Sequence, residues 1–218
     1  MKIIKAGYEI ITPINREVIL KRIEEVGRVC YKSEDKITTE SAPKFVKMLI
    51  ERGHEAMIEH CSFSVKFICD RGVSHEIVRH RIASFAQEST RYCNYSADKF
   101  GNEITVIDPC FWEYEPDGSD EASNQMYKFN DWQMACEYAE KTYFKLLKRG
   151  AAPQEARSVL PGSLKTEIVV TMNLREWRHF FKLRTANTAH PQMREITMPL
   201  LNELKEKLPE IFEDIAEI

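Results

Sequence analysis

The stretch Thr166-Glu167-Ile168-Val169-Val170-Thr171-Met172-Asn173-Leu174-Arg175-Glu176 predicts a β-strand that passes directly into an α-helix. Its first seven residues are rich in β-branched side chains, which favour strands. Asn173 is a good helix N-cap, and Glu176 follows three residues later, as in a capping box. We expect this helix to run to about Arg184.

Other elements are predicted on both sides of this segment. Phe63, Val65, Phe67 and Cys69 alternate with other side chains, which indicates a second strand, and residues 104–107 form a short third one. After a turn at 70–72, a helix from about Val73 is expected to carry Arg79-His80-Arg81. The other helices are predicted from Thr12-Pro13 to about Cys30, from Ser41 to a stop at Gly53, from about Asn124 to Arg149, and from Pro191 to about Leu208.

These elements predict an α+β fold. Helices outnumber strands and do not alternate with them regularly, so a doubly wound sheet is not expected. We expect residues 1–218 to form a single layered domain, with a mainly antiparallel sheet flanked by long helices. The acidic segment 113–124 contains Pro116, Asp117, Gly118 and Ser119, and is predicted to be an exposed loop.

The composition is that of an ordinary globular protein. Of the 218 residues, 43% are hydrophobic and 30% are charged, and the formal net charge is −3. This charge argues against broad nucleic-acid binding, although it does not exclude a local basic pocket. No apolar run is long enough for a membrane span, and the N-terminus lacks the apolar core of a signal peptide. The six scattered cysteines form no Cys-x-x-Cys pair, so we expect reduced thiols and a cytoplasmic protein.

Residues 79–92 carry the strongest functional signal, Arg79-His80-Arg81-Ile82-Ala83-Ser84-Phe85-Ala86-Gln87-Glu88-Ser89-Thr90-Arg91-Tyr92. Arginine forks match phosphate oxygens two at a time and keep their charge at any working pH. Hydroxyls and backbone donors can satisfy the remaining phosphate lone pairs. The stretch therefore predicts a pocket for one or two phosphorylated ligands.

Other chemistries fit the sequence less well. His75 and His80 are five residues apart and His54 and His60 six, so neither pair has the spacing of the zinc-protease motif, and no metal is expected. Ser89 has no Gly-x-Ser-x-Gly elbow, and Cys93 has no activating flank. No Gly-x-Gly-x-x-Gly occurs, which excludes the Rossmann mode of dinucleotide binding.

The chain resembles the flavin-dependent thymidylate synthases. Arg79-His80-Arg81, followed after seven residues by Ser89, is similar to the signature of that family, and Thr90-Arg91-Tyr92 extends the match. Three further segments resemble family motifs in the family's order: Gly53-His54-Glu55-Ala56-Met57-Ile58-Glu59-His60, Ala156-Arg157-Ser158-Val159-Leu160-Pro161, and Asn173-Leu174-Arg175 with Leu183-Arg184.

The resemblance implies methylation of dUMP to dTMP, with methylenetetrahydrofolate as carbon donor, NADPH as reductant and FAD as cofactor. It also implies a homotetramer with active sites at subunit interfaces. No nucleic-acid or membrane partner is expected, because of the net charge and the lack of a long apolar run. Arg184 matches the catalytic residue that stabilises charge on the uracil ring. The flavin-binding positions are Arg79, His80, Arg81, Gln87, Asn173, Arg175 and His179. The substrate-binding positions are Glu76, Arg79, Gln87, Glu88, Ser89, Thr90, Arg91, Arg157 and Arg184.

The sequence departs from the family pattern at four positions. Ala56 and Met57 stand where Ser or Thr followed by Pro is common, so a hydroxyl contact to the flavin is lost. Ala86 replaces a frequent Asn, and Glu76 a frequent Gln. The alternative to an enzyme is a non-catalytic nucleotide- or RNA-binding module that uses the same basic residues. Such a module would bind polymers in a salt-sensitive way and carry no chromophore.

Overall fold

The computed structural model describes residues 1–112 and 119–216. The chain divides into two compact units. Unit 1 comprises Met1–Gly7, Ile68–Ile77 and Ala86–Ile168, and unit 2 comprises Tyr8–Phe67, Val78–Phe85 and Val169–Ile218. The α+β class is confirmed, with long helices and a mainly antiparallel sheet. That residues 1–218 act as a single domain stays a prediction.

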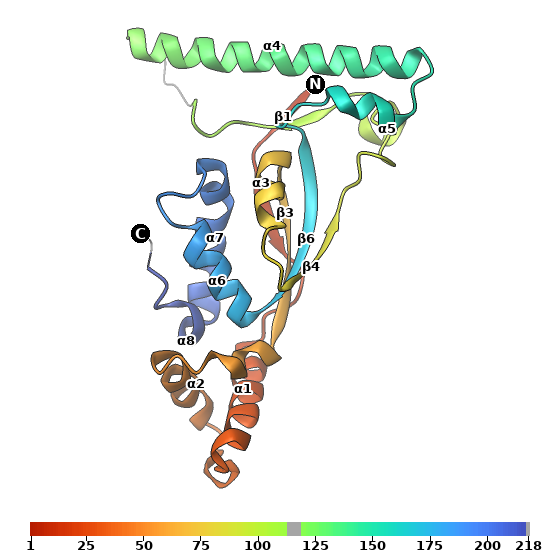
Figure 1. Cartoon of the computed structure of the whole chain (residues 1–218). Helices are drawn as coiled ribbons and strands as arrows, with labels where there is room; N and C mark the ends of the chain where they lie inside the picture. The colour runs from red at the N-terminus through yellow and green to blue at the C-terminus, as the bar shows by residue number, and fades with distance from the viewer. Residues whose placement is uncertain (113–118, 217–218) are drawn as a thin grey trace. The chain divides into compact units, whose positions relative to one another are not determined.

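The main sheet has four strands in the order β2-β3-β6-β4 (Figure 1). Their bounds are Gly7–Ile10 for β2, Ser62–Asp70 for β3, Ala83–Gln87 for β4 and Lys165–Asn173 for β6. In β3 and β6 every second side chain is buried. The sequence predicted this alternation for β3, whereas β6 was predicted from its β-branched residues. β4 was not predicted. Its side chains are mostly exposed, so it lacks the apolar alternation of a buried strand.

Unit 1 is built around one long helix. Figure 1 shows α4 (Asp120–Lys148) as a continuous rod. One side of α4 buries Cys136 and Tyr143 in a core with Tyr95, Ile104 and Val106. The unit also contains a parallel pair of short strands, β1 (Lys2–Ile4) and β5 (Thr105–Ile107). Its remaining elements are α3 (Arg71–Ile77), η3 (Asp98–Phe100), α5 (Pro153–Ala156) and η4 (Arg157–Val159).

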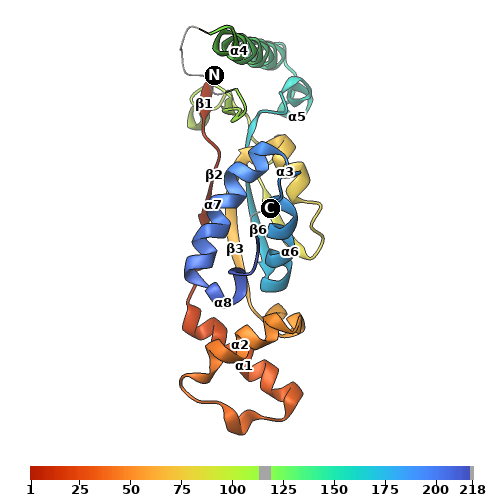
Figure 2. The ribbon, with the colours of Figure 1, turned by 90° about the vertical axis from the view of Figure 1, so that its left-hand side faces the viewer.

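Unit 2 holds an aromatic core beneath helix α6 (Leu174–Arg184). Trp177 stacks on Phe63 with ring centroids 4.9 Å apart, and its indole Nε1 donates to the Phe63 carbonyl at 3.2 Å. Figure 2 shows α6 near α7 and α8. The unit's other elements are α1 (Arg16–Tyr31), η1 (Glu34–Lys36), α2 (Ser41–Glu51), η2 (Glu55–His60), α7 (Pro191–Lys207) and α8 (Pro209–Phe212).

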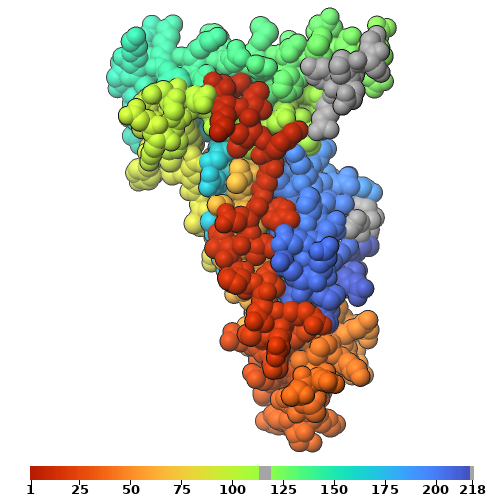
Figure 3. Space-filling view, turned by 180° about the vertical axis from the view of Figure 1, so that it is seen from behind, coloured from red at the N-terminus to blue at the C-terminus, as the bar shows by residue number. Residues whose placement is uncertain are grey.

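The first strand of unit 2 lies against helix α7. Figure 3 shows the red segment that contains β2 beside blue α7. There the Tyr8 hydroxyl donates to the Glu203 carboxylate at 3.0 Å. Burial and this hydrogen bond raise the pKa of Tyr8 to about 12, so Tyr8 stays protonated and remains a donor at neutral pH.

Several predicted helix boundaries were wrong because other side chains provide the caps. Asn15, not Thr12, caps α1 by accepting from Val18 N at 3.1 Å. The predicted turn at 70–72 is instead the start of α3, since Asp70 Oδ1 accepts from Val73 N at 2.6 Å. α3 ends at Ile77, so Arg79-His80-Arg81 lies in the following loop rather than on the helix.

The predicted acidic loop needs a correction at its C-terminal end. Its residues 113–118 lie outside the described part of the chain. Asp120 to Asn124, however, form the first turns of α4, which is capped where Ser119 Oγ accepts from Ala122 N at 3.1 Å. Among the described helices, none combines the length and apolar character needed to span a bilayer.

Candidate active site

Unit 1 contains a pocket of 580 Å³ whose charged lining is cationic. Arg71 and His75 come from one face of α3, four residues apart, and Arg157 comes from η4. No carboxylate is found among the described residues that line this pocket. The remaining lining residues are Thr90, Gln154, Ser158, Leu160, Pro161, Gly162 and Leu164. Positive charge, hydroxyls and open volume together suit a phosphate group.

Two predicted nucleotide-binding residues meet in this pocket. Arg157 Nη1 donates to Thr90 Oγ1 at 3.2 Å, although the residues are 67 positions apart in the chain. Thr90 is buried, whereas the Arg157 side chain is exposed. Thr90 therefore holds one nitrogen of the guanidinium of an exposed arginine. Arg71 and His75 were not predicted as site residues. Their spacing of four along a helix was the available signal.

The neighbouring motif residues in unit 1 already form hydrogen bonds within the protein. Gln87 Nε2 donates to Ser74 Oγ at 2.9 Å and to Thr166 Oγ1 at 3.2 Å. Glu88 accepts from Lys165 Nζ at 3.0 Å and from the Tyr95 hydroxyl at 3.3 Å. Gln87 and Glu88 are therefore fixed in place by the protein itself. The predicted contacts of Gln87 with ligands would have to use its carbonyl oxygen.

The turn after β4 presents the rest of the motif. Ser89 Oγ accepts from Arg91 N at 3.3 Å, and the Ser89 carbonyl accepts from Cys93 N at 2.9 Å. Arg91 is exposed, with its guanidinium 5.6 Å from the centre of the Tyr92 ring. Glu76, at the end of α3, is half-buried. These side chains lie at the surface of unit 1.

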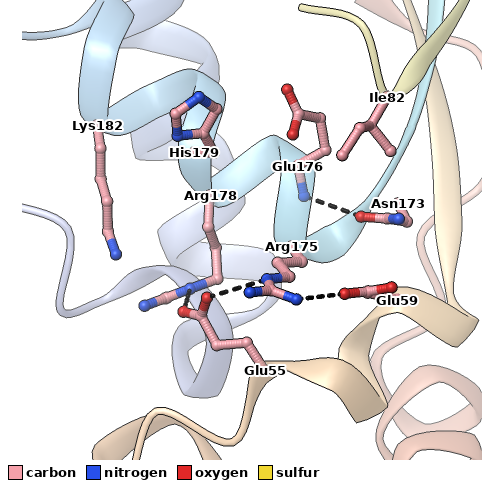
Figure 4. A pocket seen from close by; sticks show the side chains of 9 residues that line it. All are labelled: Glu55, Glu59, Ile82, Asn173, Arg175, Glu176, Arg178, His179 and Lys182. Atoms are coloured by element: carbon pink, nitrogen blue, oxygen red, sulfur yellow. Dashed lines mark hydrogen bonds and ion pairs between the residues drawn. The ribbon is translucent and has the colours of Figure 1, made fainter.

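Unit 2 contains a second pocket, of 430 Å³, along helix α6 (Figure 4). It includes the predicted flavin-binding residues Asn173, Arg175 and His179. Asn173 Oδ1 accepts from Glu176 N at 2.9 Å, which confirms the predicted cap. The other lining residues are Glu55, Glu59, Ile82, Glu176, Arg178 and Lys182. Lys182 and Glu55 were not predicted as site residues.

The arginines of this second pocket differ in their availability. Figure 4 shows both Arg175 and Arg178 linked to Glu55. Arg178 is 2% exposed and is held by Glu55 and Asp214. The Arg175 side chain is 53% exposed, and its closest partner is the exposed Glu59, at 2.5 Å. Since exposed ion pairs contribute little, Arg175 can exchange Glu59 for a bound anion.

The predicted catalytic arginine is joined to the basic motif by a buried histidine. Arg184 Nε donates to His80 Nε2 at 3.1 Å, and His80 Nδ1 is 3.0 Å from Glu176 Oε1. His80 is 4% exposed, while its neighbours Arg79 and Arg81 are exposed. The motif therefore divides into one buried and two exposed groups. The predicted capping box is only half formed, because the Glu176 carboxylate binds His80 and not the Asn173 backbone.

His80, Glu176 and His179 also form a group that could ligate a metal ion, with ligand atoms within 4.8 Å of one another. These residues come from two segments, so their proximity was not visible in the histidine spacing. The guanidinium of Arg184 is 3.1 Å from His80 Nε2, which places a fixed positive charge beside the group. Repulsion from this charge disfavours a cation at this group, and the absence of a metal stays a prediction.

The fold and the two pockets define an α+β protein whose first pocket is suited to binding an anionic ligand. A sequence profile of the family described as "Thymidylate synthase complementing protein" matches residues 17–210. Three relatives are each described as a flavin-dependent thymidylate synthase. That of Pyrococcus abyssi is 34% identical over 80% of this chain and 67% of its own length. The Geobacter sulfurreducens protein is 32% identical over 86% of this chain and 78% of its own length. The Corynebacterium aurimucosum protein is 34% identical over 88% of this chain and 78% of its own length.

The chain belongs to the family of flavin-dependent thymidylate synthases. The resemblance seen in the motifs is therefore confirmed, and the chain is an enzyme. The alternative, a non-catalytic nucleotide- or RNA-binding module, is rejected. At one departure from the family pattern, Met57 is buried, so its side chain contributes to packing rather than to ligand contact.

Proposed function

We propose that this chain methylates dUMP to dTMP, with methylenetetrahydrofolate as carbon donor, NADPH as reductant and FAD as cofactor. Family membership supports the reaction. The observation that carries the assignment of residues is the contact between Arg157 and Thr90, since two separate family motifs meet in a pocket whose described lining holds no carboxylate. This pocket is proposed to take the phosphate of dUMP, and Ser89, Arg91 and Glu88 are assigned to nucleotide binding by their motif positions.

The second pocket, which Glu55, Glu59 and Glu176 also line, offers groups that a flavin dinucleotide can use. Arg175 and Lys182 offer cations for the diphosphate, and Ile82 offers an apolar surface for a ring. We assign flavin binding to Arg79, His80, Arg81, Gln87, Asn173, Arg175 and His179. Bound FAD supplies the transfer of reducing equivalents from NADPH, while the protein supplies orientation and charge.

Arg184 is assigned to the uracil ring. The carbon that is methylated is a weak nucleophile, and it becomes reactive when negative charge develops on the ring. A guanidinium fixed at the carbonyl edge stabilises that charge, most effectively where water is excluded. Arg184 is half-buried and held through its Nε, so its orientation is set before substrate binds. Glu76 and Arg79 are assigned to nucleotide binding by their motif positions.

We also propose a homotetramer in the cytoplasm, with active sites at subunit interfaces. Its support is the exposure of Tyr127, Met134 and Tyr138 on α4, since large apolar side chains of this kind often mark interfaces. Cys69 and Cys136 are buried free thiols, as a reducing compartment allows. Light scattering coupled to gel filtration tests the tetramer, and a stable monomer would contradict it.

The reaction is tested with purified protein, dUMP, methylenetetrahydrofolate, NADPH and FAD. We expect a yellow protein that forms dTMP, and we expect no dTMP when any one component is omitted from flavin-depleted enzyme. The failure to form dTMP under all conditions, or undiminished turnover without flavin, would contradict the proposal.

A further inference from the structure

The two ring nitrogens of His80 face two different partners. Nδ1 lies 3.0 Å from Glu176 Oε1, and Nε2 lies 3.1 Å from Arg184 Nε. Both His80 and Glu176 are buried. The aromatic ring of Phe180 packs edge-on against the imidazole with centroids 4.9 Å apart, which restricts its rotation. The contact therefore links a carboxylate to the predicted catalytic arginine through one fixed ring.

The partners determine which ring nitrogen carries the proton. The Nε of an arginine always bears hydrogen and can only donate. His80 Nε2 must therefore offer its lone pair to Arg184. In the neutral ring the hydrogen is then on Nδ1, and it is donated to the Glu176 carboxylate. Burial lowers the pKa of His80, which outweighs the opposite effect of its hydrogen bond to Glu176, so the neutral ring is favoured.

We propose that Glu176 is a positioning residue for Arg184, because it holds the hydrogen of His80 on Nδ1 and so keeps Nε2 as the acceptor for the Arg184 Nε–H. This contact fixes the plane of the guanidinium, and with it the direction of its terminal NH₂ groups. The inference deepens the proposed function and rests on it, since the role of Arg184 at the uracil ring is part of that proposal.

A carboxylate suits this role because it accepts hydrogen bonds and cannot donate when ionised. Without an acceptor at Nδ1, the hydrogen can move to Nε2. Two N–H groups, from His80 and Arg184, would then face each other and the contact would be lost. Arg184 would keep its charge but lose the contact that orients its Nε. In a preorganised site, a misplacement of about 1 Å can cost about 10²-fold in rate.

Two substitutions separate positioning from simple stability. Glu176→Met removes the acceptor and keeps the side-chain length, while the backbone N–H that bonds Asn173 is unchanged. Glu176→Gln keeps a carbonyl acceptor and serves as the conservative rescue. Glu203→Met is the matched control, because it removes a carboxylate of the same unit that bonds Tyr8 and not His80.

The first readout is ¹⁵N NMR of the histidine rings in the protein without added ligands, with the His80 signals assigned by their loss in a His80→Gln variant. We expect the Nδ1–H form in the parent, in Glu176→Gln and in Glu203→Met. Glu176→Met should show a mixture or the Nε2–H form. An unchanged Nδ1–H form in Glu176→Met would overturn the proposal, whatever the activity of the protein.

The second readout compares two rates at saturating FAD. In Glu176→Met, dTMP formation should fall about 10²-fold while flavin reduction by NADPH falls much less, and Glu176→Gln should recover most of the loss. Equal falls in both rates, together with a lowered Tm, would show a merely structural role and overturn the proposal. A parent protein that forms no dTMP would overturn the proposed function instead. The NMR measurement would still show which ring nitrogen of His80 carries the hydrogen in each variant.

Discussion

Arg178 and Asp214 form a two-pronged ion pair within unit 2. Arg178 Nη1 donates to Asp214 Oδ1 at 2.6 Å and Nη2 donates to Oδ2 at 2.8 Å. Arg178 also donates to Glu55 Oε1 at 2.9 Å and to the carbonyl of Ile211. The guanidinium is 2% exposed, so nearly all of its donors depend on protein partners. The pair ties the C-terminal segment to helix α6 through a residue that also lines the second pocket.

Asp214→Asn is expected to destabilise the protein. The substitution removes the charge that matches a buried guanidinium, and it leaves one fork of Arg178 poorly satisfied. Because Asp214 is half exposed, we expect a loss of about 1–3 kcal/mol rather than the full cost of a buried pair. Denaturant unfolding measures this loss as a decrease in the free energy of unfolding. Glu17→Gln, at the exposed pair with Lys21, should leave the midpoint unchanged, and equal effects of the two substitutions would contradict the account.

The same pair predicts a dependence of stability on acid pH. Hydrogen bonding to Arg178 holds the pKa of Asp214 below its ordinary value. The stabilisation is therefore complete above the unfolded pKa of about 3.9, and it is lost as pH falls through the lower folded pKa. The difference in unfolding free energy between the parent and Asp214→Asn should be constant from neutral pH to about pH 5 and shrink below about pH 4. A difference that grows on acidification would contradict this.

Arg157→Ala is expected to weaken the binding of dUMP through its phosphate. The loss of one charge-assisted hydrogen bond costs about 1.5–3 kcal/mol, which is roughly tenfold to more than a hundredfold in Kd. Titration with dUMP and with deoxyuridine distinguishes a contact to the phosphate from a contact to the rest of the nucleoside. In Arg157→Ala, only the affinity for dUMP should fall. Arg149→Ala, an exposed cation of the same unit, is the control. Unchanged affinity of Arg157→Ala for dUMP would remove Arg157 from the site.

No cysteine is expected to attack the uracil ring. Burial raises the pKa of the Cys69 thiol to about 12, and it also raises those of Cys61 and Cys136, so these groups stay protonated. Cys93 is half-buried beside the motif and packs against the unit 1 core. We expect Cys93→Ala to form dTMP at close to the parent rate. Complete loss of turnover in a folded Cys93→Ala enzyme would indicate thiol chemistry.

The sequence predicted those parts of the fold in which local pattern and burial agree. β3 was found by its alternating apolar residues and β6 by its β-branched residues, and the Asn173 cap was found because it needs only residues three positions apart. β4 was missed because its side chains are mostly exposed. At Asn15 and Asp70, two capping residues were overlooked because neighbouring Thr12-Pro13 and Arg71-Gly72 offered competing local signals.

The candidate site was predicted residue by residue through the family motifs, but its internal contacts were not. His80 and Glu176 are 96 positions apart, and Thr90 and Arg157 are 67 apart. Such pairs depend on the tertiary fold, which a single sequence does not display. Arg71 and His75 belong to no motif that was matched, and they become visible as site residues only when α3 places them in one pocket.

The central claim, that Arg184 activates uracil, is tested most directly by Arg184→Lys. Lysine keeps the charge but loses the planar fork and the Nε–H that reaches His80. Flavin reduction by NADPH and dTMP formation are measured in the same preparation at saturating dUMP. We predict that flavin reduction continues while dTMP formation falls by about 10²–10³. Formation of dTMP at the parent rate, or loss of the flavin itself, would contradict the assignment.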